Sequence, residues 1–206
     1  YYIFLNGMDN QVFEIEGTNQ SDVTISLNAL QVNLMPYLLE ECMPTEAIFE
    51  GITDNLLIVQ DDNGLYYVPS FDVMTLTEMC PGEAYEIFLI GMDDIEFQYP
   101  QLDGLARTQS ENSIYWEEYV QSSKSLQYEF KQTGISHPVI ITHIEGEVQI
   151  GDELVAYAHG QVVGASIIID LDSPIVIAAW GSFNNYGIQL PGYDIDDAIE
   201  LRLWSE

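Results

Sequence analysis

The chain has 206 residues, of which 47% are hydrophobic, and its 34 acidic residues stand against four Lys and Arg, a formal net charge of −30. A chain this apolar is not a disordered acidic tail. Nucleic-acid binding is excluded because phosphate contacts need clustered cations, and no run of 18 apolar residues exists, so we expect no membrane insertion.

The basic residues are distributed unevenly, since residues 1–106 contain no Lys or Arg. That half cannot form ordinary acid–base salt bridges within itself, so apolar burial and backbone hydrogen bonds must hold it together. Dissolved salt shortens the range of charge repulsion to roughly 8 Å at physiological ionic strength. The charge therefore favours a saline, extracellular setting and disfavours anionic membrane surfaces.

We interpret residues 1–21 as a strand hairpin that ends a preceding module, with residues 1–5 pairing with residues 11–16 across a turn-rich tip. The opening Tyr-Tyr-Ile-Phe-Leu lacks the basic region and cleavage site of a secretory signal. We expect the chain to be a mature or excised piece of a longer secreted polypeptide.

Residues 22–99 are predicted to form a first β-rich module with one short helix that begins at Pro44. Asp61-Asp62-Asn63-Gly64 has the composition of a hairpin loop, and Cys80-Pro81-Gly82 that of a turn. Leu30, Val32 and Leu34 alternate along one strand face. The expected strands are residues 23–27, 30–34, 56–59, 65–68 and 84–90.

Residues 100–125 are predicted to be a linker because they are polar and contain Pro and Gly. Trp116 and Tyr119 indicate that part of this linker docks on a domain.

Residues 126–206 are predicted to form a second β-sandwich module, with Gly- or Asp-rich turns between short apolar runs. The expected strands are residues 126–130, 138–144, 154–158, 162–169, 175–180 and 198–204. The fold class is therefore mainly β, with two small sandwich- or barrel-like modules in tandem, and we expect a helix only in the first.

The second module carries ordered motifs: Gly151-Asp152-Glu153, then Val163-Gly164-Ala165, then Ala179-Trp180-Gly181, then Leu201-Arg202-Leu203-Trp204. This order resembles tandem repeat modules in large secreted and cell-surface proteins of marine Bacteroidetes-type bacteria. The first module resembles the one that often precedes it, through residues 52–59, Gly64, Tyr67, Pro69 and residues 81–87. The resemblance implies adhesins, surface fibres or tail-like appendages, and it supplies no ligand and no catalytic residue.

Cys42 and Cys80 are the two cysteines. An even pair in a secreted protein favours a disulfide, with two buried free thiols as the alternative. A single pair lacks the ligands of a structural zinc site.

Enzyme motifs are not found: the three histidines have no metal-binding spacing, and no nucleophile elbow, phosphate loop or dinucleotide motif occurs. We expect no cofactor other than calcium, which prefers six to eight oxygen ligands. The best calcium candidates are Asp194, Asp196 and Asp197, followed by Asp170 and Asp172. Turn-forming Asp chemistry is the alternative at each loop.

The leading hypothesis is therefore a non-catalytic structural or adhesive module whose partners are other copies of itself or neighbouring modules. One alternative is a carbohydrate-binding module in which Tyr115, Trp116 and Tyr119 stack on glycans. Another is a phage or injection-system fibre domain, and a hydrolase is the least favoured.

Overall fold

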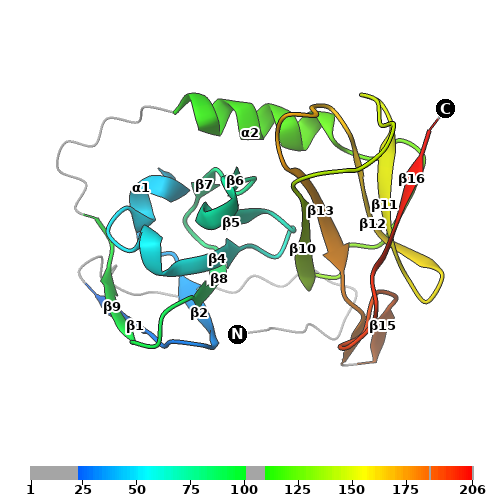
Figure 1. The fold of residues 1–206 in the computed structure, drawn as a ribbon. Helices are drawn as coiled ribbons and strands as arrows, with labels where there is room; N and C mark the ends of the chain where they lie inside the picture. Colours follow the sequence, from blue (N-terminus) through cyan, green and yellow to red (C-terminus); the bar gives the residue numbers. More distant parts are fainter. Residues whose placement is uncertain (1–22, 101–109, 186, 206) are drawn as a thin grey trace, which may run out of the picture.

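The computed structural model describes residues 23–100, 110–185 and 187–205 (Figure 1). The fold is mainly β, as the sequence predicts. An N-terminal part, residues 23–100, and a C-terminal part, residues 123–205, lie side by side, and helix α2 runs above both in Figure 1. The hairpin expected within residues 1–21 lies outside the described residues.

The N-terminal part centres on a five-stranded antiparallel sheet in the order β2-β8-β4-β5-β6. Strand β1 pairs with β9, and β3 pairs with β7. The strands are β1 Thr24–Leu27, β2 Val32–Pro36, β3 Met43–Pro44, β4 Leu56–Gln60, β5 Tyr66–Val68, β6 Val73–Met74, β7 Glu78–Met79, β8 Ala84–Leu89 and β9 Ile95–Gln98. The short helices are α1 Thr45–Phe49, η1 Thr53–Asn55 and η2 Pro69–Phe71.

Most strands predicted in this part are confirmed, and so is the short helix after Pro44. The hairpin loop between β4 and β5 is also confirmed: Asp61 Oδ1 accepts the N–H groups of Asn63 and Leu65, and Gly64 takes a φ of 81°. In β2 it is Asn33 and Met35 that turn inward, so the face carrying Val32 and Leu34 is exposed to solvent.

The predicted disulfide is confirmed: Cys42 and Cys80 are bonded, with their Cα atoms 4.1 Å apart. The two cysteines flank the short β3–β7 ladder, in which Met43 is opposite Met79. The bond therefore closes the segment that contains α1, β4, β5 and β6.

The C-terminal part contains a three-stranded sheet in the order β12-β11-β16, a β10–β13 pair and a small β14–β15 hairpin. The strands are β10 Ser136–Ile141, β11 Glu153–Ala158, β12 Gln161–Ile167, β13 Ile175–Trp180, β14 Phe183–Asn185, β15 Ile188–Leu190 and β16 Glu200–Trp204. Gly164 lies where β12 approaches β13, and a Cβ there would come within 2.3 Å of the Ala178 carbonyl oxygen. The absence of a side chain at Gly164 therefore lets the two strands approach closely.

The strand predicted at residues 126–130 is wrong. The buried carboxylate of Glu153 accepts hydrogen bonds from Ser125 Oγ at 2.5 Å, Leu126 N at 3.0 Å and Gln127 N at 3.2 Å. These donors bind one carboxylate and are unavailable to a β-ladder, so the segment takes a turn.

The expectation that only the first module holds a helix is also wrong, because α2 spans Glu111–Ser122 within the predicted linker. Ser110 caps its N-terminus by accepting a hydrogen bond from Ser113 N at 3.1 Å. Its buried residues, Ser113, Trp116 and Tyr119, recur every third position, while Glu111, Glu117 and Glu118 surround them. The expected docking through Trp116 and Tyr119 is confirmed.

Strand β13 is buried on both faces. Ile175, Ile177 and Ala179 pack in a second core with residues of β11 and β12. Val176 and Ala178 pack against the first core, which includes Trp116 and Tyr119 of α2 and most buried residues of the N-terminal part. The unbroken apolar run Ile-Val-Ile-Ala-Ala-Trp is typical of a strand covered on both sides. The two parts therefore share β13 as a common structural element.

Candidate functional site

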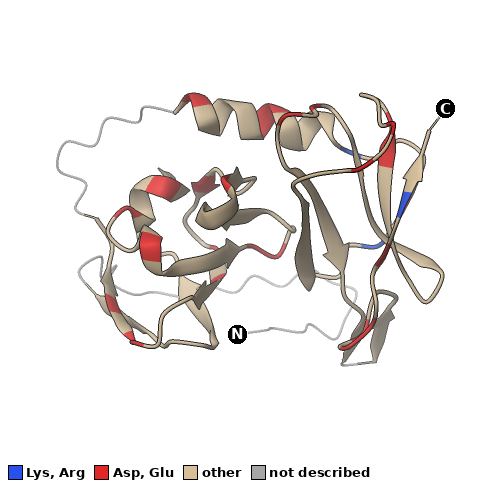
Figure 2. Ribbon diagram, viewed as in Figure 1, with Lys and Arg blue, Asp and Glu red and all other residues tan. Residues whose placement is uncertain are grey.

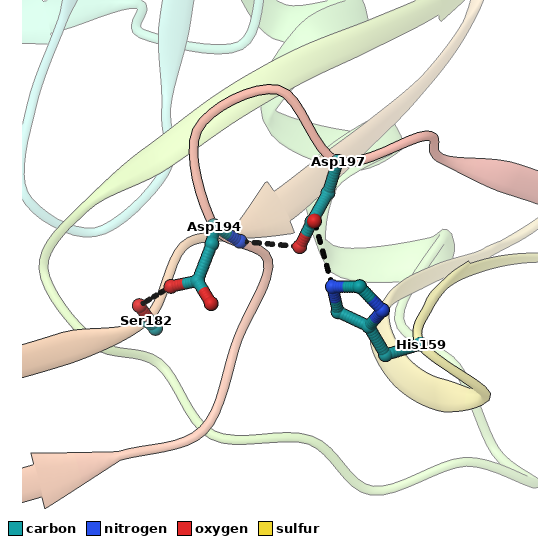
Figure 3. A network of polar contacts seen from close by, with 4 residues as sticks. All are labelled: His159, Ser182, Asp194 and Asp197. Carbon is teal, nitrogen blue, oxygen red and sulfur yellow. Dashed lines mark hydrogen bonds and ion pairs between the residues drawn. The ribbon is translucent and has the colours of Figure 1, made fainter.

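The acidic loop at residues 194–197 is held together by its own hydrogen bonds (Figure 3). Asp197 Oδ2 accepts the N–H of Asp194 at 2.7 Å, and Asp197 N donates to Asp194 O at 3.1 Å. Ser182 Oγ donates to the Asp194 carboxylate. Backbone bonds from Ser182 N to Tyr193 O, and from Tyr193 N to Trp180 O, tie the loop to the end of β13.

His159 reaches the same loop from the turn between β11 and β12, with Nε2 at 2.6 Å from Asp197 Oδ1 (Figure 3). Within the described part of the chain, His159, Asp194 and Asp197 are the group of side chains placed to share one metal ion. The Asp194 N–H, together with His159, lowers the pKa of the Asp197 carboxyl below its ordinary value. Asp196 is exposed, takes a φ of 72° and does not belong to this group.

Asp170 and Asp172 form a separate turn instead of joining the 194–197 loop. Asp170 accepts hydrogen bonds from Asp172 N at 2.9 Å, Ser173 Oγ at 2.7 Å and the Tyr115 hydroxyl at 3.3 Å. The bond from Asp172 N is the main cause of a lowered pKa at Asp170. The structure thus divides the five predicted aspartates between two loops.

The chemistry of the His159 cluster differs from that of a typical calcium site. Calcium prefers six to eight oxygens, whereas this cluster offers two carboxylates and an imidazole nitrogen. Both oxygens of Asp197 already accept hydrogen bonds or contact His159. The observed contacts are those of Asp-stabilised turns, and calcium binding stays a prediction.

The predicted glycan platform requires a correction. Trp116 and Tyr119 are only 2% and 3% exposed, and their rings pack edge-on with centroids 4.9 Å apart. Tyr115 is half-buried, with its hydroxyl directed to Asp170. Trp116 and Tyr119 thus belong to the core and cannot stack on a sugar from solvent. They are three positions apart in α2, which places both on the buried face of the helix.

A cavity of about 570 Å³ lies between the N-terminal hairpin loop, the end of α2 and the strands β12 and β13. We call it the lysine cavity because Lys124 and Lys131 line it. Its further polar lining residues include Asn63, Ser123, Ser125, Ser166 and Gln132, and its aromatic ones Tyr119, Tyr128, Phe130 and Trp180. No local sequence pattern indicates this cavity, and the one usable signal is the presence of two lysines in a chain with only four Lys and Arg.

Comparison with protein-family models, curated proteins and solved structures finds no match in any of the three. Neither the length nor the apolar content of any helix in the described residues suffices to span a membrane.

Proposed function

We propose that this chain is a non-catalytic structural or adhesive module of an extracellular protein and serves as a rigid segment of a surface fibre or adhesin. The observation that carries the proposal is the position of β13 between two cores. Val176 packs with α2 and the N-terminal part, while Ile175 and Ile177 pack with β11 and β12. A strand shared in this way resists hinge motion between the two parts. A segment of a fibre or adhesin under tension needs this rigidity.

A second contact supports the same rigidity. Gly64, in the hairpin loop of the N-terminal part, lies so close to Trp180 that a Cβ at position 64 would be 2.8 Å from Cζ2 of the indole. Trp180 is 1% exposed and ends β13. The loop and the strand therefore meet without space for a side chain, which fixes how the two parts are placed.

The surface and the covalent structure support an extracellular setting. The Cys42–Cys80 bond is of the kind that persists in oxidising compartments. Asp and Glu are spread over both parts in Figure 2, with few Lys or Arg. Such a surface tolerates high salt, because salt screens the repulsion between its carboxylates.

Two strands lie at sheet edges, counting only the residues that the structure describes, and offer places for assembly with other copies or with neighbouring modules. Strand β2 ends the five-stranded sheet and exposes Val32 and Leu34, and β16 ends the three-stranded sheet with Leu201 and Leu203 each 41% exposed. Open strand edges accept further strands through backbone hydrogen bonds. These edges support a partner role for extended segments of the same polypeptide.

Single-molecule force spectroscopy tests the mechanical role. The chain, held between two handle proteins, is expected to unfold in one event in the oxidised form. Reduction should add roughly 130 Å of extension, because the bond bridges a sequence separation of 38 residues at about 3.5 Å per residue.

Two separate unfolding events at clearly different forces would contradict a single rigid segment. Labelling of Cys42 and Cys80 in the producing cells tests location: we expect the chain outside the cell with both thiols protected. A chain found inside the cell with both cysteines reduced would overturn the extracellular proposal.

A further inference from the structure

The lysine cavity differs in charge from the rest of this acidic protein. Its described lining includes two lysines and no Asp or Glu, although the chain has 34 acidic residues and four Lys and Arg in total. Half of all its cations therefore line one cavity.

Neither lysine is neutralised by a described carboxylate. Arg202 pairs with Glu200 at 3.0 Å, whereas Lys124 and Lys131 make no ion pair with any residue that the structure describes. Both lysines are exposed at the cavity rim. Because carboxylates outnumber cations so strongly, two lysines left without one in a shared cavity indicate a site for an anion from outside the chain.

Two acidic residues outside the lining hold segments that line the cavity, while Asp62, Glu118 and Glu129, which are next to lining residues in sequence, have exposed side chains. Glu153 accepts three hydrogen bonds from residues 125–127. Asp61 accepts hydrogen bonds from the backbone N–H groups of Asn63 and Leu65. Their hydrogen bonds fix the two segments that carry Ser125, Tyr128 and Gly64, so they shape the cavity.

The rest of the lining suits a sugar. Tyr128 and Phe130 are half-buried aromatic rings, on which the apolar face of a pyranose can pack. Ser123, Ser166 and Gln132 provide hydroxyl and amide groups for sugar hydroxyls. Trp180 also lines the cavity, and its buried Nε1–H has no hydrogen-bond partner among the described residues. The volume of about 570 Å³ is within the range of small-molecule sites.

We propose that the lysine cavity binds an acidic sugar, a glycan unit that carries a carboxylate, with Lys124 and Lys131 contacting the charge and Tyr128 and Phe130 the ring. The site goes beyond the structural role and does not depend on it. The net charge of −30 repels an anion at long range, but screening limits this repulsion to roughly 8 Å at physiological ionic strength. At short range the two lysines attract an anion that enters the cavity.

Lys124 has a competing role, because it follows the C-terminus of α2, where a cation favourably opposes the helix dipole. That role predicts a loss of stability in Lys124→Gln and no effect on ligand binding. Lys131 lies away from the helix end in sequence and has no such role. The two variants together separate the helix effect from a binding effect.

Isothermal titration calorimetry of the whole chain with α-1,4-linked trigalacturonate tests the proposal. Its fully methyl-esterified form is the matched control ligand, because it keeps the sugar and removes the charge. We expect the acid to bind and the ester to bind at least tenfold more weakly. Lys124→Gln and Lys131→Gln should each raise Kd about tenfold, the usual effect of losing one charged hydrogen bond.

Arg202→Gln is the matched control variant, since it removes the same charge from a residue that does not line the cavity, and it should leave Kd within about twofold. Phe130→Ala should weaken binding of the acid and of the ester alike. Thermal unfolding of each variant verifies that it is folded.

Three results would overturn the proposal: no binding of trigalacturonate, equal binding of acid and ester, or equal effects of Arg202→Gln and the two lysine variants. Tetraglutamate binding as tightly as trigalacturonate would show a site for acidic peptide and would also overturn it. Each of these results leaves the force-spectroscopy prediction for the structural role untouched.

Discussion

The Tyr119 hydroxyl accepts a hydrogen bond from the backbone N–H of Val176 at 2.8 Å, which joins α2 to β13 across 57 positions of sequence. Tyr119 is 3% exposed and Val176 is 8% exposed, so little water reaches this bond. Burial raises the pKa of the Tyr119 hydroxyl, which keeps it neutral. One side chain thus attaches the helix to the strand that the two cores share.

Replacing Tyr119 by Phe should leave the Val176 N–H buried without an acceptor. A buried unsatisfied donor costs about 1–3 kcal/mol, and chemical denaturation should show a loss of that size. Tyr115→Phe is the control, since its hydroxyl donates a longer bond of 3.3 Å to the half-buried carboxylate of Asp170, and it should lose less. Equal losses of stability in both variants would show that the Tyr119–Val176 bond contributes no more than the Tyr115–Asp170 bond.

Gly164→Ala should be strongly destabilising, because the new Cβ would meet the Ala178 carbonyl oxygen at 2.3 Å. Neither backbone can move freely, since both strands contribute to the second core, and we expect a loss of more than about 2 kcal/mol. Gly51→Ala is the matched control, as nothing lies within 4 Å of its added methyl group. A Gly164→Ala protein as stable as Gly51→Ala would show that β12 and β13 are further apart than described.

Removing the disulfide with Cys42→Ser and Cys80→Ser should lower the free energy of unfolding by about 3–4 kcal/mol, the loop-entropy value for a sequence separation of 38. The reduced wild-type chain should match the double variant in denaturant titrations. If reduction changed the midpoint of unfolding by less than a tenth of a molar of guanidinium, the bond would be dispensable for stability.

The 194–197 loop should loosen in acid. The pKa of Asp197 is lowered in the folded protein, so its ionised form stabilises the loop at pH values above its unfolded pKa of about 3.9, and that contribution is lost as pH falls through the lower folded pKa. An NMR titration should give Asp197 a lower midpoint than an Asp in the unfolded chain, with faster exchange of the Asp194 amide at lower pH. Asp197→Ala should expose that amide at every pH, whereas Asp196→Ala should not.

The sequence predicts elements well where local pattern determines the structure. The 61–64 hairpin follows from Asn-Gly turn chemistry, and the full extent of β13 follows from its apolar run.

The failures come from contacts between residues distant in sequence. The helix α2 was missed because its buried stripe is only one residue wide and is surrounded by polar residues. The expected strand at residues 126–130 is turned by Glu153, whose hydrogen bonds no local pattern indicates. The lysine cavity is formed by segments around residues 64, 124, 131 and 166, so only the folded chain brings its members together.

The central claim, that β13 makes the two parts one body, is tested most directly by native-state hydrogen exchange in increasing denaturant. The amides of β8 in the N-terminal part, β11 in the C-terminal part and β13 between them are followed together. A shared strand predicts that all three sets converge on one opening free energy with one denaturant dependence. If β8 and β11 instead opened with separate free energies, and β13 followed only one of them, the two parts would be independent and the claim would be wrong.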